Sequence, residues 1–157
     1  MGRPTWTIAW NEGMSVGIPE IDEDHKHFIL LINEFNRSIT DRRDSDEIKT
    51  RLQNITLDAA RHFAHEEKLL KQWQYPDINV HAQIHIYILK ELQAIKEQFA
   101  PYGLDSGWVD AGLRIKKLLL DHILTADMKY AELYQNSHNA LGEMRKFTPT
   151  VPVKVPA

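Results

Sequence analysis

The sequence predicts an all-α fold: an up-down-up-down antiparallel four-helix bundle over residues 20–135, with an N-terminal arm over residues 1–19 and a C-terminal extension over residues 136–157. Two observations lead to this prediction. Apolar residues recur every three or four positions through four long segments in which glycine is sparse, which is the pattern of amphipathic helices. The segments are joined by only a few residues each, and connections of that length make consecutive helices antiparallel neighbours.

The first two helices have recognisable start signals. The first is predicted over Glu20–Ile39, because the preceding Pro19 is favoured in the first turn of a helix. The second is predicted to begin at residue 44 or 45 and to run to residue 73, because Asp44 followed by Glu47 resembles a capping box. The inward stripe of the first helix consists of Ile21, Phe28, Leu31, Ile32 and Phe35.

The last two helices are bounded by helix-breaking residues. The third is predicted to open at residues 77–79 and to end at Phe99, because Pro101 and Gly103 break its pattern. The fourth is predicted to begin at residue 105 or 106 and to end near Tyr134. The extension carries prolines at positions 149, 152 and 156, too many for a core element, so we expect a mobile segment or a linker.

Composition excludes several classes of protein. A chain without cysteine forms no disulfide, thiolate zinc site, cysteine nucleophile or iron–sulfur cluster. Lys and Arg number 19 against 22 Asp and Glu, a net charge of −3, and the basic residues are scattered, which argues against nucleic acid as a partner. No segment approaches the roughly 20 apolar residues of a membrane span or contains a signal-peptide core, so we expect a cytoplasmic protein.

The eight histidines carry the main functional signal. His62 with Glu66, and His81 with His85, are four residues apart, a spacing that puts both side chains on one helix face. Either pair alone is typical of a solvated helix surface. The bundle topology, however, brings both pairs to one level, together with ligand-type residues early in the first helix and late in the fourth. We therefore predict a buried metal site formed by His25, His62, Glu66, His81, His85, His122 and Asp127.

This donor set suits two metal ions. Five imidazoles and two carboxylates are too many donors for one ion but fit two, with the carboxylates bridging, and the metal can be iron, manganese, zinc or copper. His122 and Asp127 are five residues apart, about 140° around an ideal helix, so we predict a π-type turn between Ile123 and Asp127. The remaining histidines lie off the inward faces or in the extension and are expected to be solvated: His27, His65 and His138.

Over residues 10–130 the sequence resembles the bacterial hemerythrins, a family of non-haem di-iron, oxygen-binding four-helix bundles. The resemblance is carried, in order, by IDEDHKHFILLINEFN, HFAHEEKLLKQWQYP, HAQIH and HILTADMKY. It implies that one iron is held by His81, His85 and His122, and the other by His25 and His62. It also implies that Glu66 and Asp127 bridge the two irons together with an oxo or hydroxo ligand. Dioxygen is then expected to bind at the open position of the iron with two histidines.

The sequence departs from the family pattern at two places. Asp24 stands where the family commonly has Gln, and we expect it to add an acceptor and a negative charge near the site. Leu118-Leu119 stands where the family commonly has Trp-Leu, and the smaller residue at 118 is expected to open the pocket. The apolar oxygen pocket is expected to consist of Phe28, Ile29, Phe63 and Leu119, with Trp10 from the arm as a lid.

Three functions are compatible with this site. Reversible dioxygen binding, for carriage, storage or delivery to an oxygen-consuming partner, is preferred, because the ligand set leaves no catalytic acid or base over. A second function is oxygen or redox sensing, in which the proline-containing extension signals to an effector. A third is a di-iron enzyme that turns over peroxide or nitric oxide, which requires a substrate path that the sequence does not show.

Overall fold

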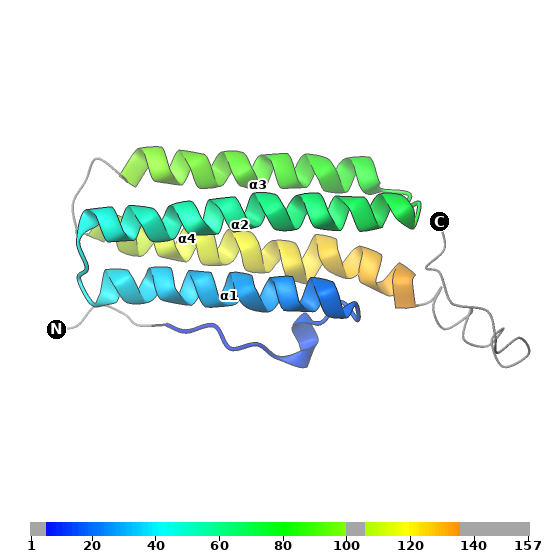
Figure 1. The fold of residues 1–157 in the computed structure, drawn as a ribbon, viewed down its shortest axis with the longest axis horizontal. Coiled ribbons are helices and arrows are strands. Elements are labelled where there is room, and N and C mark those ends of the chain that lie inside the picture. Colours follow the sequence, from blue (N-terminus) through cyan, green and yellow to red (C-terminus); the bar gives the residue numbers. More distant parts are fainter. Residues whose placement is uncertain (1–5, 100–105, 136–157) are drawn as a thin grey trace, which may run out of the picture.

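The computed structural model describes residues 6–99 and 106–135 and confirms the four-helix bundle (Figure 1). The helices are α1 (Pro19–Thr40), α2 (Ser45–Gln72), α3 (Ile78–Phe99) and α4 (Ser106–His122). A short 3₁₀ helix, η1 (Glu12–Met14), precedes them, and a π-helix, η2 (Ile123–Asp127), continues α4 into α-helical residues 128–135. Each helix packs against two others, in the order α1, α2, α3, α4 and back to α1.

Local signals place the helix ends close to the predicted positions. The Asp44 carboxylate caps α2 by accepting the Glu47 backbone N–H at 2.8 Å. Both α1 and α2 end with a residue in the left-handed region, Arg42 at φ 55° and Gln74 at φ 53°. In each case the next amide donates to the carbonyl five residues earlier at 2.9 Å, which closes the helix and reverses the chain.

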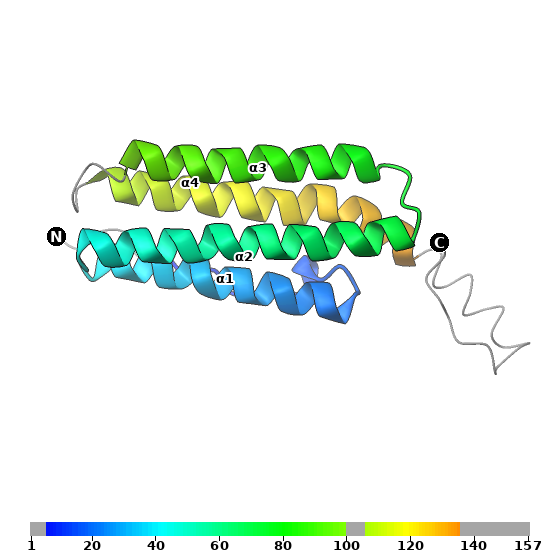
Figure 2. The ribbon, with the colours of Figure 1, turned by 45° about the horizontal axis from the view of Figure 1, so that its top comes forward.

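All four helices bring one terminus to the same end of the bundle. The starts of α1 and α3 and the C-terminal ends of α2 and of the fourth helix lie together there (Figures 1 and 2). We call this the α2–α3 end, after the connection that it contains. The antiparallel arrangement follows from the short connections, as the sequence predicted. Within residues 6–99 and 106–135, none of the helices is both long and apolar enough to cross a membrane.

The described part of the arm, residues 6–18, runs along α1 (Figure 1). The Asn33 side chain pairs with both backbone groups of Ile8, accepting its N–H and donating to its carbonyl, each at 2.9 Å. Asn36 donates to the Trp6 carbonyl at 2.9 Å. These contacts dock the arm on the bundle. The predicted C-terminal extension, residues 136–157, lies outside the described residues.

Two apolar clusters form the core, and they leave a polar layer between them. The larger cluster extends from the middle of the bundle to the end opposite the α2–α3 end, and the smaller one lies at the α2–α3 end. On α1, for example, Ile21 belongs to the smaller cluster and Phe28 to the larger, with His25 between them. The predicted stripe of α1 is buried, except that Leu31 is only partly buried against the larger cluster.

Candidate metal centre

The structure brings all seven predicted ligands together in this polar layer, where each is at most 5 % exposed. They come from α1, α2, α3, the last residue of α4 and the last residue of η2. Two overlapping groups have ligand atoms within 4.8 Å of one another. The first group contains His81, His85, His122, Glu66 and Asp127, and the second contains His25, His62, Glu66 and Asp127. We call the histidines of these groups the three-histidine half and the two-histidine half.

Glu66 presents one oxygen to each half. Its Oε1 lies 2.6 Å from His81 Nε2 and 3.0 Å from His85 Nε2. Its Oε2 lies 3.2 Å from His62 Nε2 and accepts the Tyr130 hydroxyl at 2.9 Å. A carboxylate that divides its oxygens in this way is arranged as a bridge between two sites.

Asp127 divides its oxygens in the same way. Its Oδ1 lies 3.2 Å from His81 Nε2 and 3.0 Å from His122 Nε2. Its Oδ2 lies 3.2 Å from His25 Nε2. Both carboxylates therefore face the three-histidine half with one oxygen and the two-histidine half with the other. This division is independent of any assumption about the metal.

The predicted π-type turn between Ile123 and Asp127 is confirmed. The wider turn of a π-helix places residues five apart closer to one face than an α-helix does. His122 and Asp127 are both buried and their side chains meet at 3.0 Å, which regular α-helical geometry would oppose. The distortion of the fourth helix thus serves the site directly.

The buried groups carry opposite charges in the described structure. Burial lowers the pKa of His62, but contacts with Asp24 and Glu66 outweigh burial and raise the pKa to about 9. The pKa of His81 shifts in the same direction: burial lowers it, but contacts with Asp127 and Glu66 raise it to about 9. Conversely, burial raises the pKa of Glu66, but contacts with the histidines hold the pKa well below its ordinary value. Protons on these imidazoles therefore balance the buried carboxylates, and metal ions would replace them.

Several polar atoms of the site are close to one another without hydrogen-bond geometry. Within the described residues, both nitrogens of His25, Nε2 of His62, Nδ1 of His122 and both carboxylate oxygens of Asp127 have no hydrogen-bond partner. Buried polar groups left in this state are costly. Nitrogen and oxygen donors converging from four helices would be satisfied by cations between them, so the residues fit a dinuclear metal centre.

Outside the seven predicted ligands, Tyr130 is a site residue that the sequence did not predict. Its hydroxyl donates to Glu66 Oε2, on the side of the two-histidine half. Burial and the charges of Asp127 and Glu66 raise the pKa of Tyr130 well above its ordinary value, so the hydroxyl keeps its proton. The sequence feature that could have identified Tyr130 is its position three residues after Asp127, which puts both side chains on one helix face.

Two acidic residues hold ligand histidines from outside the layer. Asp24 Oδ2 accepts from His62 Nδ1 at 2.8 Å, so the acceptor expected at position 24 is present. Glu67 Oε1 accepts from His85 Nδ1 at 2.8 Å, a contact the sequence did not predict. Such partners fix the ring orientation and leave Nε2 facing the position that a metal ion would occupy.

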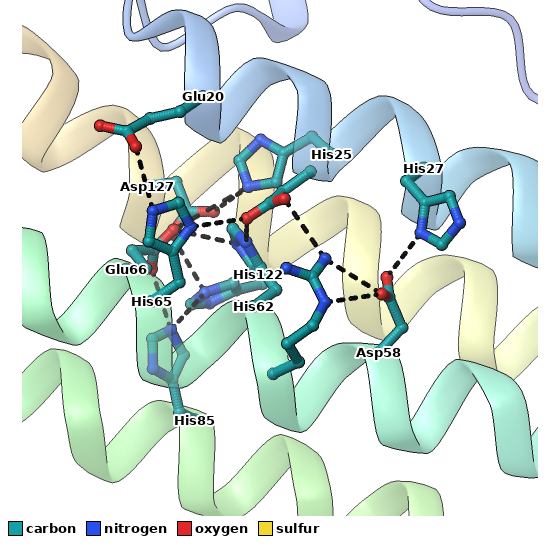
Figure 3. A network of polar contacts seen from close by, with 12 residues as sticks. Glu20, His25, His27, Asp58, His62, His65, Glu66, His85, His122 and Asp127 are labelled. Carbon is teal, nitrogen blue, oxygen red and sulfur yellow. Dashed lines mark hydrogen bonds and ion pairs between the residues drawn. The ribbon is translucent and has the colours of Figure 1, made fainter.

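The remaining histidines follow the prediction only in part. His27 is exposed, as expected, and contacts Asp58 at 3.1 Å. The prediction for His65 holds in part: its side chain lies off the inward face but is only 31 % exposed, because its ring nitrogens face Asp24 at 2.9 Å and Glu20 at 3.1 Å. Figure 3 shows the contact with Glu20. Its position off the inward face still places it where α1 and α2 meet. His138 lies outside the described residues.

The predicted apolar wall is buried beside the site. Phe63 stacks on His85 with ring centres 3.9 Å apart, and Phe28 packs edge-on against His62 at 5.1 Å. Ile29 and Leu119 belong to the same buried cluster. Trp10 is only partly buried against that cluster, and no interaction described in residues 6–99 and 106–135 joins it to a site histidine, so its role as a lid stays a prediction.

Leu118 lines a groove between α3 and the fourth helix. The groove has a volume of about 430 Å³, and its lining reaches His122 of the three-histidine half. The groove is lined by none of the residues predicted for the oxygen pocket, so the opening of that pocket at position 118 stays a prediction.

Comparison with known proteins agrees with this geometry. The pattern of the Hemerythrin HHE cation binding domain matches residues 16–134, well over half of the chain. The chain belongs to the hemerythrin family. A bacteriohemerythrin from Stenotrophomonas maltophilia is 26 % identical over 129 residues, covering 80 % of each chain. A myohemerythrin from Theromyzon tessulatum is 26 % identical over 121 residues, covering 77 % of this chain and 88 % of the relative. Hemerythrins bind dioxygen and iron, and the layer described above is the part of this hemerythrin that can hold metal.

Proposed function

We propose that this hemerythrin binds dioxygen reversibly at a di-iron centre, for oxygen carriage, storage or delivery. The observation that carries the proposal is the division of both carboxylates between the two halves. His81, His85 and His122 would hold one iron, and His25 and His62 the other, with Glu66 and Asp127 shared. When bound, the iron pair supplies the reversible electron transfer that dioxygen binding needs.

The protein's own residues would shape where dioxygen is received. The two-histidine half has one imidazole fewer, which leaves more room for an added ligand on that side. The Tyr130 hydroxyl lies at the same side, where it holds Glu66 Oε2 and keeps its proton. Phe28 and Phe63 pack against the histidines and would limit the access of water to the layer. Exclusion of water favours reversible binding, because water promotes loss of the bound ligand as a reduced product.

The test is metal analysis together with one optical experiment. We expect two irons per chain, and a charge-transfer band in the visible when the reduced, iron-loaded protein meets air. The band should disappear on deoxygenation and return on a second exposure. The metal-free protein is the control and should show no band. A fully iron-loaded protein without a reversible band, or a protein isolated with zinc, would refute the proposal.

Sensing and enzymatic turnover remain predictions from the sequence. The extension that would carry a signal lies outside the described residues, and within those residues no observation favours peroxide or nitric oxide as a substrate. Cytoplasmic location likewise stays a prediction.

A further inference from the structure

Asp24 connects the two-histidine half of the site to the protein surface. It lies on α1 directly before His25, and its side chain is 14 % exposed. Its Oδ2 accepts from His62 Nδ1 at 2.8 Å and from His65 Nδ1 at 2.9 Å. Its Oδ1 accepts from Arg61 Nη2 at 3.3 Å. Three donors from α2 therefore hold one carboxylate of α1 in place.

The contacts continue outward as a series of neighbouring side chains (Figure 3). His62 is 1 % exposed, Asp24 14 %, His65 31 % and Glu20 55 %, and neighbours in this series are 2.8, 2.9 and 3.1 Å apart. Exposure rises at each step from the polar layer to solvent. Within this series of four side chains, Asp24 is the member that contacts a proposed ligand, His62, from outside the layer.

Two consequences follow from the hydrogen bond between Asp24 and His62. A carboxylate accepts but does not donate, so His62 must carry its proton on Nδ1 and present Nε2 toward the metal. The negative charge beside the ring also makes the imidazole a stronger donor, and a stronger donor stabilises the more positive, oxidised metal.

We propose that Asp24 is a positioning residue that orients His62 toward the metal and lowers the reduction potential of the iron in the two-histidine half. The inference rests on the proposed metal centre but not on dioxygen binding. The two short contacts of Asp24 Oδ2, with His62 Nδ1 at 2.8 Å and with His65 Nδ1 at 2.9 Å, carry the inference.

Asp58 provides a matched control on the same surface. Like Asp24, it is largely covered, at 9 % exposure, and it contacts Arg61 and a histidine, His27. Figure 3 shows this pair set apart from the polar layer. Within the described residues, no contact joins Asp58 to any of the seven proposed ligands.

The experiment compares Asp24→Ala, Asp24→Asn and Asp58→Asn in iron-loaded protein. We expect Asp24→Ala to lower iron affinity by about 10- to 100-fold, measured against a competing chelator. Asp24→Asn keeps an acceptor for His62 Nδ1–H and should retain affinity while raising the reduction potential in a spectroelectrochemical titration. Asp58→Asn should change neither. Equal affinities in Asp24→Ala and Asp58→Asn, or equal potentials in wild type and Asp24→Asn, would overturn the proposal.

A second readout separates this inference from the proposed function. In ¹⁵N-histidine-labelled protein loaded with zinc, the His62 Nδ1–H proton should give a downfield, slowly exchanging signal. The signal should persist in Asp24→Asn and disappear in Asp24→Ala, and its presence in both variants would count against Asp24 as the partner. A wild-type chain that takes up two irons without binding dioxygen would refute the proposed function while leaving the role of Asp24 intact.

Discussion

The two halves of the site differ in what surrounds them. The three-histidine half is backed by apolar packing, with Phe63 stacked on His85, and by the groove lined by Leu118. The two-histidine half is connected through Asp24 to the partly exposed His65 and the exposed Glu20, and the Tyr130 hydroxyl donates to the Glu66 oxygen that faces this half. The half with fewer ligands therefore has more polar partners around it. We expect this distribution to favour an added ligand at the two-histidine half.

The strongest test of this comparison is the residue shared by both halves. Glu66→Ala removes one oxygen from each half, so we expect metal affinity to fall more than about 100-fold. Substitution of residues that only support metal ligands costs about 10- to 100-fold. Glu67→Gln, which alters only the partner of His85, is the neighbouring control and should cost about tenfold or less. Metal per chain after equilibrium dialysis measures both. Retention of two metals by Glu66→Ala would rule out a bridging role.

Single-histidine variants should separate the halves. His62→Ala leaves one imidazole in the two-histidine half, so we expect the chain to keep one metal tightly and lose the other. His85→Ala leaves two imidazoles in the three-histidine half, and we expect two metals, one of them bound about tenfold or more weakly. Calorimetric titration with Co²⁺ gives stoichiometry and affinity together. Identical titration curves for the two variants would mean that the halves are not distinct.

Metal removal should change both stability and its dependence on pH. A metal at about 1,000 times its Kd adds about 4 kcal/mol, or roughly 10 °C in Tm for a domain of this size. Without metal, the pKa of His62 and His81 is raised from 6.5 to about 9, so their stabilisation is complete below pH 6.5 and is lost as pH rises through 9. Glu66 has a lowered pKa, so its contribution is present above pH 4.5 and is lost on acidification below that value.

The expected dependence of stability on pH follows from the directions of these pKa shifts. The metal-free protein should be most stable between about pH 4.5 and 6.5. Metal binding requires deprotonated imidazole, so the metal should add more stability as the pH rises from 6 to 9. Thermal melts of chelated and reloaded protein measure the difference in Tm. A difference that shrinks over this range would show that the histidines are not the groups that exchange protons for metal.

Residue positions along helices made most of the fold, and the convergence of the seven predicted ligands, predictable from the sequence. Helix ends depend on local signals such as the Asp44 cap, and the bundle follows from the apolar period and short connections. Each ligand's place along its helix then fixes its level in the bundle. Even the π-helix was predictable, because His122 and Asp127 cannot both face inward on a regular helix.

Contacts that depend on how neighbouring helices are rotated and offset were not predictable. Asp24 and His65 lie off the inward faces of α1 and α2, yet they meet at 2.9 Å where the two helices approach. That meeting depends on side-chain packing along the whole helix pair, which the pattern of a single helix does not contain. Tyr130 was missed for a different reason: a buried tyrosine near a helix end is usually core, and only the position of Glu66 Oε2 gives its hydroxyl a partner.

The smallest expected effect tests where an added ligand enters. Leu118→Trp should fill part of the groove of about 430 Å³ next to His122, on the three-histidine side. We propose that the added ligand enters at the two-histidine half. We therefore expect the rate of azide binding to the oxidised, iron-loaded protein to change less than about twofold, because partly filling a groove on the other side leaves the entry barrier nearly unaltered. Leu113→Trp adds the same ring to α4 at an exposed position outside the groove and serves as the control. A tenfold slowing in stopped-flow measurements of Leu118→Trp alone would place ligand entry at the groove and reverse the roles assigned to the two halves.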